Sequence, residues 1–513
     1  MASIKDLRDF LDELEKRGEL CRVTDEVHWK LEMSAIGAMS NRLDDKIPLF
    51  EKIKGYPDGQ RAVTDPYRGS HGAIHRRIAI SLGMDSNMSY EEYTEEFIER
   101  LNHPIRPIVV DKGECQEVVH LGEDANVFKY IPVPFIHEGD GGRYFDILTI
   151  IAKDPDSDWN NWCNYRCMVH SKNKMGILFT AGQQTANLYY FKYEARNQPM
   201  PVAIALGGLP ATSHVAGMPL PAGVSEVDYA GGLMKEPVQL VKCITNDLLV
   251  PASAEFIIEG VMLPGERVDE GPFGEFLGYI HGPRRPAPVV RVQAITHRKN
   301  PILPFCIAGA GHGDSTTYLS SEFNALLTPT VLNVVRSLGF PVKAIVGPET
   351  NSYASVIIAT KVPYQGYVKE LAELILAVPG PSMYVDQIFV VDEDVDISNM
   401  EAVWEEVMLK SHPIRDWHNY RDPEGPRSPL NIYQKAEEKG TLRMAATVAK
   451  TSKCYIDATT KQWDEVEMGP RRMEFETLYP TYKHWVEKNR SRFGIPPYED
   501  FRHEGIPWMA KKA

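Results

Sequence analysis

The stretch Phe145-Asp-Ile-Leu-Thr-Ile-Ile-Ala152 is a short apolar and β-branched run, which is typical of a buried strand. Gly/Pro turns such as Met218-Pro-Leu-Pro-Ala-Gly223 separate it from similar runs that follow. These runs lie at 176–180, 202–206, 238–243, 256–261, 289–295 and 302–307. Many short strands joined by such turns predict a sheet-rich barrel or sandwich between about residues 115 and 310.

The sequence on both sides of this region mixes helices with strands. Near the N-terminus, Ser3 can cap a helix whose apolar residues recur at three- and four-residue spacing, and Gly18 can end that helix. The polar, Pro-rich stretch 411–427 predicts a long loop. Between these two segments, alternating helices and strands are predicted at 319–338, 355–360, 365–377 and 387–391.

The composition is that of an ordinary globular protein. Hydrophobic residues make up 43% and charged residues 25% of the 513 residues, which argues against a disordered chain and predicts about three domains. The 56 Lys and Arg against 70 Asp and Glu give a net charge of −14, so nucleic acid and anionic membranes are poor candidate partners. No apolar stretch approaches the roughly 20 residues that a bilayer requires. The seven cysteines are scattered without a Cys-x-x-Cys pair, and a reducing cytoplasm is the expected location.

The segment Glu270-Gly-Pro-Phe-Gly-Glu275 places two carboxylates around an aromatic residue in a backbone constrained by glycine and proline. Paired acids held in this way suit proton transfer, because one can stay ionised while burial raises the pKa of the other. A surface turn is the alternative that the spacing alone leaves open.

Two further segments combine residue types that bind ligands. Trp159-Asn-Asn-Trp-Cys-Asn-Tyr-Arg166 sets amides beside aromatics, which suits a ring-shaped ligand with a phosphate, and its arginine can hold a carboxylate through two hydrogen bonds. Ala216-Gly-Met-Pro-Leu-Pro-Ala-Gly-Val-Ser-Glu226 is a Gly/Pro loop that leads to an acid. Loop carbonyls and a carboxylate are hard ligands, suitable for a cation that bridges to a phosphate.

Two other motifs are less informative. Gly309-Ala-Gly-His-Gly313 lacks the spacing of a dinucleotide fingerprint, so it is either a plain turn or a loop that presents His312 to a pocket. Asp392-Glu-Asp-Val-Asp396 begins like a calcium loop but has Ile397 and Val403 where glycine and glutamate are required. It therefore predicts a strand end with solvated acids.

The three ligand-binding segments occur together and in order, and the sequence closely resembles the UbiD family of reversible decarboxylases. The cofactor of that family is prenylated flavin mononucleotide (prenylated FMN). Further matching segments extend the resemblance over nearly the whole chain. They are Asp6-Leu-Arg-Asp-Phe-Leu11, Gly18-Glu-Leu20, Val241-Lys-Cys-Ile-Thr-Asn-Asp-Leu248, Val250-Pro-Ala-Ser-Ala-Glu255, Val390-Val-Asp-Glu-Asp-Val-Asp396 and Ile456-Asp-Ala-Thr459.

This resemblance implies an α/β (α+β) multidomain fold with a central flavin-reductase-like split β-barrel. An N-terminal α/β domain is expected at 1–112, the barrel that binds prenylated FMN at 113–315, and a C-terminal α/β oligomerisation domain with a helical tail at 316–513. Family members are dimers or hexamers, so a homodimer or homohexamer is expected. A separate flavin prenyltransferase would supply the cofactor.

Carried over residue by residue, the resemblance implies that Arg166 and Glu270 form the ion pair at the reaction centre. Glu275 would deliver a proton to the carbon that carbon dioxide leaves. The residues expected to contact the cofactor are Asn161, Cys163, Asn164, Tyr165, Arg166, Gln183, Ala216, Gly217, Met218, Pro219 and Glu226.

Two metal ions are implied in the same way. The ligands of a divalent ion, manganese in family members, would be Asn161, Gln183 and Glu226. A neighbouring potassium ion would be held by Trp162, Ala216, Met218 and Glu226.

The sequence departs from the family pattern at two places. Many members have a metal-binding histidine where this chain has Gln183, in Ala181-Gly-Gln-Gln-Thr185, which leaves the identity of the divalent metal open. Some members also carry a lysine near the flavin where this chain has Pro379-Gly-Pro-Ser382.

The predicted reaction is the reversible, non-oxidative decarboxylation of an aromatic or α,β-unsaturated acid, with carbon dioxide or bicarbonate as the second product or reactant. No side chain can take up the electrons of the breaking bond, so a cofactor must do so. One alternative is an aromatic acyl-CoA substrate such as phthaloyl-CoA, whose CoA tail Arg284-Arg285 could bind. Others are a non-catalytic subunit of a carboxylase and a plain flavin reductase.

Overall fold

The computed structural model of the protein describes residues 4–43, 45–70, 73–179, 182–275, 279–281, 284–308, 321–348, 355–378, 385–425, 449–461 and 480–495. The chain divides into two compact units, Met1–Thr459 and Thr460–Ala513. The described strands all belong to the first unit, and the second contains helix α15 (Pro480–Phe493). Among the described helices, none is long and apolar enough to cross a membrane.

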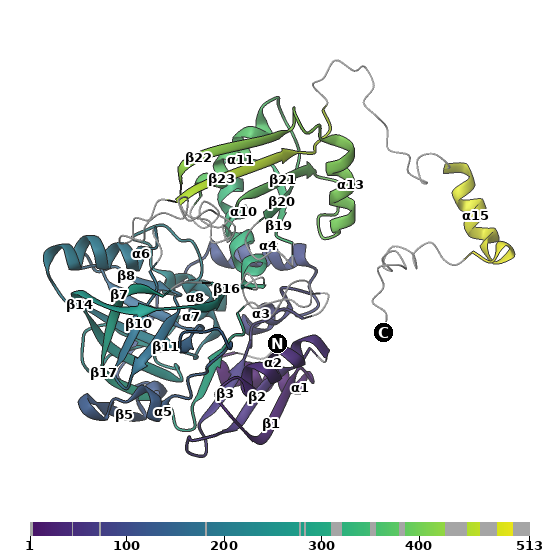
Figure 1. Cartoon of the computed structure of the whole chain (residues 1–513). Helices are drawn as coiled ribbons and strands as arrows, with labels where there is room; N and C mark the ends of the chain where they lie inside the picture. The colour runs from purple at the N-terminus through teal and green to yellow at the C-terminus, as the bar shows by residue number, and fades with distance from the viewer. Residues whose placement is uncertain are drawn as a thin grey trace. The chain divides into compact units, whose positions relative to one another are not determined.

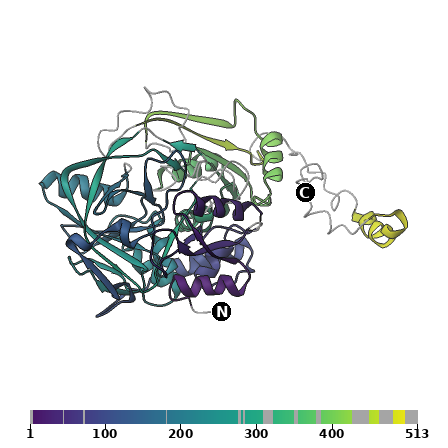
Figure 2. The same ribbon diagram turned by 60° about the horizontal axis from the view of Figure 1, so that its bottom comes forward.

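A nine-stranded sheet forms the centre of the first unit (Figure 1). Its strand order is β6-β9-β10-β17-β14-β11-β7-β8, β5 pairs with β17, and every pairing is antiparallel. The sheet curls into a half-barrel, which confirms the predicted sheet-rich central region (Figure 2). The strands are β5 (Val118–Leu121), β6 (Arg143–Phe145), β7 (Thr149–Lys153), β8 (Asn160–Cys163), β9 (Cys167–Ser171), β10 (Lys174–Ile177), β11 (Met200–Leu206), β14 (Phe256–Glu270) and β17 (Arg285–His297).

Short elements surround this sheet. A three-stranded sheet joins β4 (Ile108–Val110), β12 (Gln239–Lys242) and β13 (Leu249–Pro251), and β15 (Phe273–Glu275) pairs with β16 (Tyr279–His281). The apolar run at 238–243 thus belongs to a separate sheet. The helical segments here are η1 (Glu114–Gln116), η2 (Gly122–Asp124), α5 (Val127–Tyr130), α6 (Gln184–Asn187), η3 (Leu188–Tyr193), η4 (Glu194–Arg196), α7 (Pro210–Ala216) and α8 (Glu226–Met234).

A four-stranded sheet forms the N-terminal part, with the order β1-β2-β3-β18. Its edge strand β18 (Ile302–Phe305) follows the central sheet in sequence and pairs in parallel with β3, so the chain returns to this part after the half-barrel. Asp6, not Ser3, is the residue that caps the first helix, because its carboxylate accepts the Asp9 amide at 2.9 Å. The other elements are β1 (Leu20–Val27), β2 (Ile47–Ile53), β3 (Arg61–Thr64), α1 (Leu7–Lys16), α2 (Glu32–Leu43), α3 (Arg76–Ser81) and α4 (Tyr90–Leu101).

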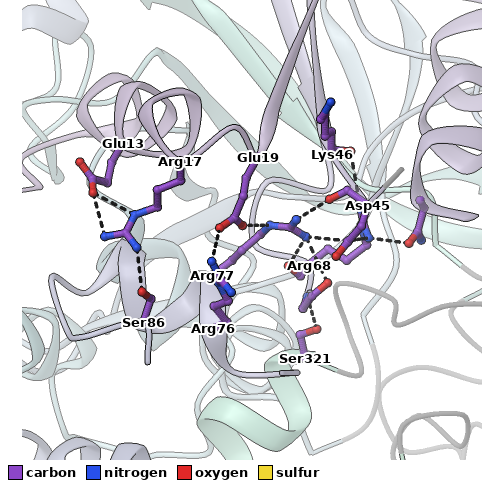
Figure 3. Close-up of polar contacts among 12 residues, drawn as sticks. Glu13, Arg17, Glu19, Asp45, Lys46, Arg68, Arg76, Arg77, Ser86 and Ser321 are labelled. Atoms are coloured by element: carbon purple, nitrogen blue, oxygen red, sulfur yellow. Dashed lines mark hydrogen bonds and ion pairs between the residues drawn. The ribbon is translucent and has the colours of Figure 1, made fainter. Parts of the chain in front are cut away.

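Buried ion pairs hold the turns of the N-terminal part together (Figure 3). The side chains of Arg68 and Arg77 are 2% and 1% exposed, and both donate to the carboxylate of Asp45, at 2.7 and 3.2 Å. Arg77 also pairs with Glu19 at 3.0 Å, so each buried charge has an opposite partner, which burial requires. The amide that follows Arg68 donates to the hydroxyl of Ser321 at 2.6 Å and connects this cluster to the start of the C-terminal part.

A mixed five-stranded sheet, β19-β20-β21-β23-β22, forms the C-terminal part. The predicted loop at 411–427 is wrong, because β22 lies within it and pairs antiparallel with β23. As an edge strand, β22 tolerates polar residues and a register shift at Asp422/Gly425, and it therefore lacks an apolar pattern. The bounds are β19 (Val342–Val346), β20 (Ser355–Thr360), β21 (Gln387–Asp392), β22 (Trp417–Gly425), β23 (Ala449–Asp457), η5 (Phe323–Leu327), α10 (Thr328–Ser337), α11 (Tyr367–Ala377) and α13 (Met400–Lys410).

The hydrophobic cores do not correspond one to one with the N-terminal, central and C-terminal parts. One continuous core extends from Ile4 to Leu326 and includes both the N-terminal sheet and the half-barrel. The C-terminal sheet is covered by two further clusters of buried residues. The mixed α/β multidomain fold is thus confirmed, and the domain boundaries at 112 and 315 stay predictions.

Candidate active site

The structure brings Arg166, Glu270 and Glu275 into direct contact. Arg166 ends the short connection between β8 and β9, and its guanidinium donates to Glu270 through Nε at 2.9 Å and Nη2 at 3.1 Å. The third guanidinium nitrogen, Nη1, donates to Glu275 Oε1. The side chains of Arg166 and Glu270 are 10% and 0% exposed, so this cluster is an interior ion pair and not a surface turn.

Aromatic residues enclose the cluster. The guanidinium carbon of Arg166 lies 4.7 Å from the ring centre of Phe273, and that ring lies 4.5 Å from the ring of Tyr144. The Tyr144 hydroxyl lies 3.2 Å from Glu270 Oε1 and accepts the Gly271 amide at 3.1 Å. Burial raises the pKa of Tyr144, so its hydroxyl stays neutral and can donate to the carboxylate.

The charge state of Arg166 follows from these contacts. Burial lowers the pKa of Arg166, but the carboxylates of Glu275 and Glu270 outweigh this effect, and the net shift is upward. The site therefore presents one permanent cation between two acids. Such a fork can hold a substrate carboxylate while a neighbouring acid handles a proton.

A second cluster contains Asn161 and Glu226. Glu226 is the first residue of α8, and its carboxylate accepts the Asn161 side-chain amide at 2.9 Å and the Trp162 main-chain amide at 3.1 Å. Thr185 donates its hydroxyl to Asn161 Oδ1 at 2.5 Å. Burial raises the pKa of Glu226 to about 7, because its partners do not offset the lost hydration.

The glutamine that contacts Asn161 is Gln184, one position after Gln183. The amide of Asn161 donates to Gln184 Oε1 at 3.0 Å, and the Gln184 amide donates to the Leu220 carbonyl at 2.7 Å. Gln183 is the residue that precedes α6. Gln184 thus joins this cluster beside the predicted Gln183.

The loop after α7 meets the segment 163–165. The main-chain amide of Asn164 donates to the Ala216 carbonyl at 3.1 Å. The side-chain oxygen of Asn164, Oδ1, is buried without a hydrogen-bond partner among the described residues. A Cβ on Gly217 would lie 2.1 Å from Glu322 Oε1, so a larger residue there would require the Glu322 side chain to move. Burial raises the pKa of Cys163 to about 12, which keeps its thiol neutral. The other residues that the sequence placed near the cofactor, Tyr165, Met218 and Pro219, are buried or half-buried here.

Some predicted features fall outside the described residues, namely His312 and Pro379-Gly-Pro-Ser382. Arg284 is described and exposed. Arg285 lies opposite Glu270 in the pairing of β17 with β14, so this arginine is near the reaction centre in sheet register. Among the described residues, no group of three or more His, Cys, Asp or Glu could hold a metal ion.

Sequence reasoning missed Asp146, which lies between β6 and β7. Its carboxylate accepts the Cys306 amide at 3.1 Å and lies 3.4 Å from the Cys306 thiol. Burial raises the pKa of Asp146 to about 7. Phe145 pairs with Cys167, the residue after Arg166, so the backbone of Asp146 is close to that of Arg166.

We expect Asp146→Asn to stabilise the protein at pH 8 and not at pH 4. The folded pKa of about 7 lies above the unfolded value, so the contribution of this carboxyl to stability falls as the pH rises from about 4 to about 7 and then levels off. The gain at pH 8 should be about 1–3 kcal/mol, measured by urea unfolding. The exposed Asp158→Asn is the control, with changes within about 0.5 kcal/mol. An equal effect of Asp146→Asn at both pH values would contradict this assignment.

Comparisons with known proteins agree with this architecture. Family models for the 3-octaprenyl-4-hydroxybenzoate carboxy-lyase (UbiD) N-terminal, Rift-related and C-terminal domains match residues 11–97, 108–311 and 325–458. The chain is 30% identical to pyrrole-2-carboxylic acid decarboxylase of Pseudomonas aeruginosa, over 96% of this chain and 99% of the relative. It is 35% identical to phenolic acid decarboxylase of Sedimentibacter hydroxybenzoicus, over 80% and 85%.

Solved structures show the same fold. The closed form of vanillic acid decarboxylase from Sedimentibacter hydroxybenzoicus has a TM-score of 0.83 at 30% identity, covering 96% of this chain and 100% of the other. The UbiD-class enzyme HmfF from Pelotomaculum thermopropionicum, in complex with prFMN, has a TM-score of 0.73 at 28% identity, covering 91% and 97%. Three consecutive family models and relatives aligned along nearly their full length leave one assignment: this chain belongs to the UbiD family of carboxy-lyases.

Proposed function

We propose that this protein decarboxylates an aromatic or α,β-unsaturated carboxylic acid with prenylated FMN as its cofactor. The observation that carries the proposal is the interior contact of Arg166 with Glu270 and Glu275. The relatives named for aromatic acids and the HmfF complex with prFMN support the substrate class and the cofactor. A non-catalytic subunit would have no need for such a cluster.

Each member of the cluster has a distinct task in this proposal. Arg166 binds the substrate carboxylate through its guanidinium, and Glu270 fixes the orientation of that guanidinium through two hydrogen bonds. When bound, prenylated FMN would supply the electron sink that breaking the carbon–carbon bond requires. Glu275 then transfers a proton to the carbon from which carbon dioxide has left, and it regains a proton from solvent.

The second cluster fits the phosphate end of a flavin mononucleotide. Asn164 Oδ1 is a buried acceptor that lacks a protein partner among the described residues, and Asn161, Gln184 and Glu226 supply oxygen atoms. We propose a divalent cation here, manganese by the family resemblance, with potassium beside Trp162, Ala216 and Met218. Oxygen donors of this kind suit hard cations. Gln183 stays a predicted ligand.

We expect Mn²⁺ to stabilise the flavin-free protein through Glu226. At a Mn²⁺ concentration 100 times the dissociation constant, the gain is about 2.7 kcal/mol, read as a rise in the unfolding midpoint. Glu226→Gln removes the buried charge, so most of this gain should disappear. Asp228→Asn, which changes the next acid on α8, is the matched control. A full Mn²⁺ response in Glu226→Gln would contradict the assignment.

The experiment that tests the proposed function is analysis of the protein co-expressed with a flavin prenyltransferase. Mass spectrometry of the released chromophore should show prenylated FMN, and the protein should release carbon dioxide from a panel of aromatic acids that includes CoA esters. Plain FMN with bleaching by NADH would favour a flavin reductase instead. A homodimer or homohexamer, a cytoplasmic location and carboxylation at high bicarbonate stay predictions.

A further inference from the structure

A turn at residues 137–142 packs against the segment Glu270–Glu275. The Gly274 amide donates to Asp140 Oδ1 at 2.7 Å, and the Gly141 amide donates to the Pro272 carbonyl at 2.7 Å. These two bonds link segments more than 130 residues apart in the sequence. The Asp140 side chain is 0% exposed, so its carboxylate is committed to these contacts.

His137 completes the contact. Its main-chain amide donates to Asp140 Oδ2 at 2.8 Å, and its Nδ1 lies 3.3 Å from the same oxygen. The imidazole occupies the space beside Gly274, because a Cβ built on that glycine would lie 2.2 Å from His137 Nδ1. Its ring also meets Phe273 edge to face, with ring centres 6.2 Å apart. The backbone that follows Phe273 is therefore held by the His137–Asp140 pair, and the Pro272 carbonyl that precedes it is held by the Gly141 amide.

We propose that His137 and Asp140 are positioning residues that fix where Glu275 delivers its proton. Asp140 anchors the amide of the residue directly before Glu275, and the His137 ring limits how closely that backbone can approach. Neither residue contacts Arg166 in the described contacts, so the pair acts on the proton donor and leaves the carboxylate-binding fork intact. This inference rests on the proposed role of Glu275.

The expected effect is confined to the protonation step. A proton donor displaced by about 1 Å costs roughly 100-fold in rate, whereas the binding of substrate and flavin depends on other residues. Loss of the Asp140 anchor should therefore lower kcat and leave KM unchanged. Because protonation would become slower than carbon dioxide release, the solvent deuterium isotope effect on kcat should increase.

The test uses the full chain loaded with prenylated FMN. Asp140→Asn keeps one acceptor oxygen, but its NH₂ group would face the main-chain amide of either Gly274 or His137, and two donors cannot hydrogen-bond to each other. We expect kcat to fall about 10- to 100-fold. Flavin content and KM should stay at the wild-type level. The control is Asp124→Asn, which alters the His120–Asp124 pair, whose acid is 54% exposed, and should leave kcat unchanged.

A pair of substitutions tests the role of the His137 ring. Gly274→Ala should lower kcat because the new methyl group meets the imidazole, and His137→Ala in the same chain should restore part of the lost rate. Faster exchange of the Gly274 amide in Asp140→Asn, measured without flavin, gives a readout that does not depend on activity. A merely structural role would produce neither the rescue nor the change in isotope effect.

The activities of two variants distinguish the role of Glu275 from that of the His137–Asp140 pair. If Glu275→Gln is active, the proposed function of that acid is wrong. If Glu275→Gln is inactive while Asp140→Asn has wild-type kcat and isotope effect, the positioning inference alone is overturned. Asp140→Asn could instead lose flavin or unfold. In that case the positioning inference is overturned if adding His137→Ala to the Gly274→Ala protein restores none of the lost kcat.

Discussion

Glu275→Gln is expected to retain prenylated FMN and to lose decarboxylation by a factor of about 10²–10⁴, the range that general acid catalysis contributes. Glutamine has nearly the size of glutamate and can still accept the hydrogen bond from Arg166 Nη1. It has no acidic proton, so the carbon that loses carbon dioxide would remain unprotonated. The measurement is carbon dioxide release under saturating substrate, together with the flavin absorbance of the purified protein.

Glu266→Gln provides the matched control for this prediction. Glu266 lies on β14 and pairs with Arg291 at 2.7 Å and with Lys174 at 3.2 Å, and the side chains of these two cations are 48% and 46% exposed. Surface ion pairs contribute about 0–1 kcal/mol, so this variant should keep wild-type activity and nearly wild-type stability. Turnover of Glu275→Gln within about threefold of wild type would exclude the proposed proton donor.

The pairing of Arg166 with Glu270 follows from the resemblance to the UbiD family, which locally distinctive segments carry, whereas spacing alone leaves a surface turn open for Glu270 and Glu275. Glycine and proline restrict the backbone from Glu270 to Glu275, and the amide-rich segment that ends at Arg166 is unusual in composition. Local patterns of this kind also predicted β20, whose bounds the structure reproduces. What the sequence could not supply is the long-range pairing that brings these segments together.

Two features that sequence reasoning missed depend on such pairing. Strand β18 was expected in the central region but pairs in parallel with β3, some 240 residues earlier. Asp140 has no motif of its own, and its importance follows from the Gly274 amide 134 residues away.

Arg166→Lys is expected to lower decarboxylation at least about 100-fold and to destabilise the protein, although it keeps the charge. A lysine ammonium cannot reproduce the two parallel hydrogen bonds that Arg166 donates to Glu270 while also reaching Glu275. Glu270 is fully buried, so a carboxylate left with incomplete hydrogen bonding raises the free energy of the folded state. Breaking a buried ion pair completely costs about 3–5 kcal/mol, which sets the upper limit for this substitution.

Arg291→Lys is the matched control, because it removes the same hydrogen-bonding fork at a position that is open to solvent. Arg291 forms the same kind of fork with Glu266, through Nε at 2.7 Å and Nη2 at 3.0 Å, but its side chain is 48% exposed. Water can replace a lost hydrogen bond there, so we expect a change below about 1 kcal/mol. The two substitutions are chemically identical, and urea unfolding of both proteins compares them directly. Equal losses of unfolding free energy in the two variants would mean that the interior position of Arg166 adds nothing to stability. A large loss only at Arg166 would tie the stabilisation to the buried fork.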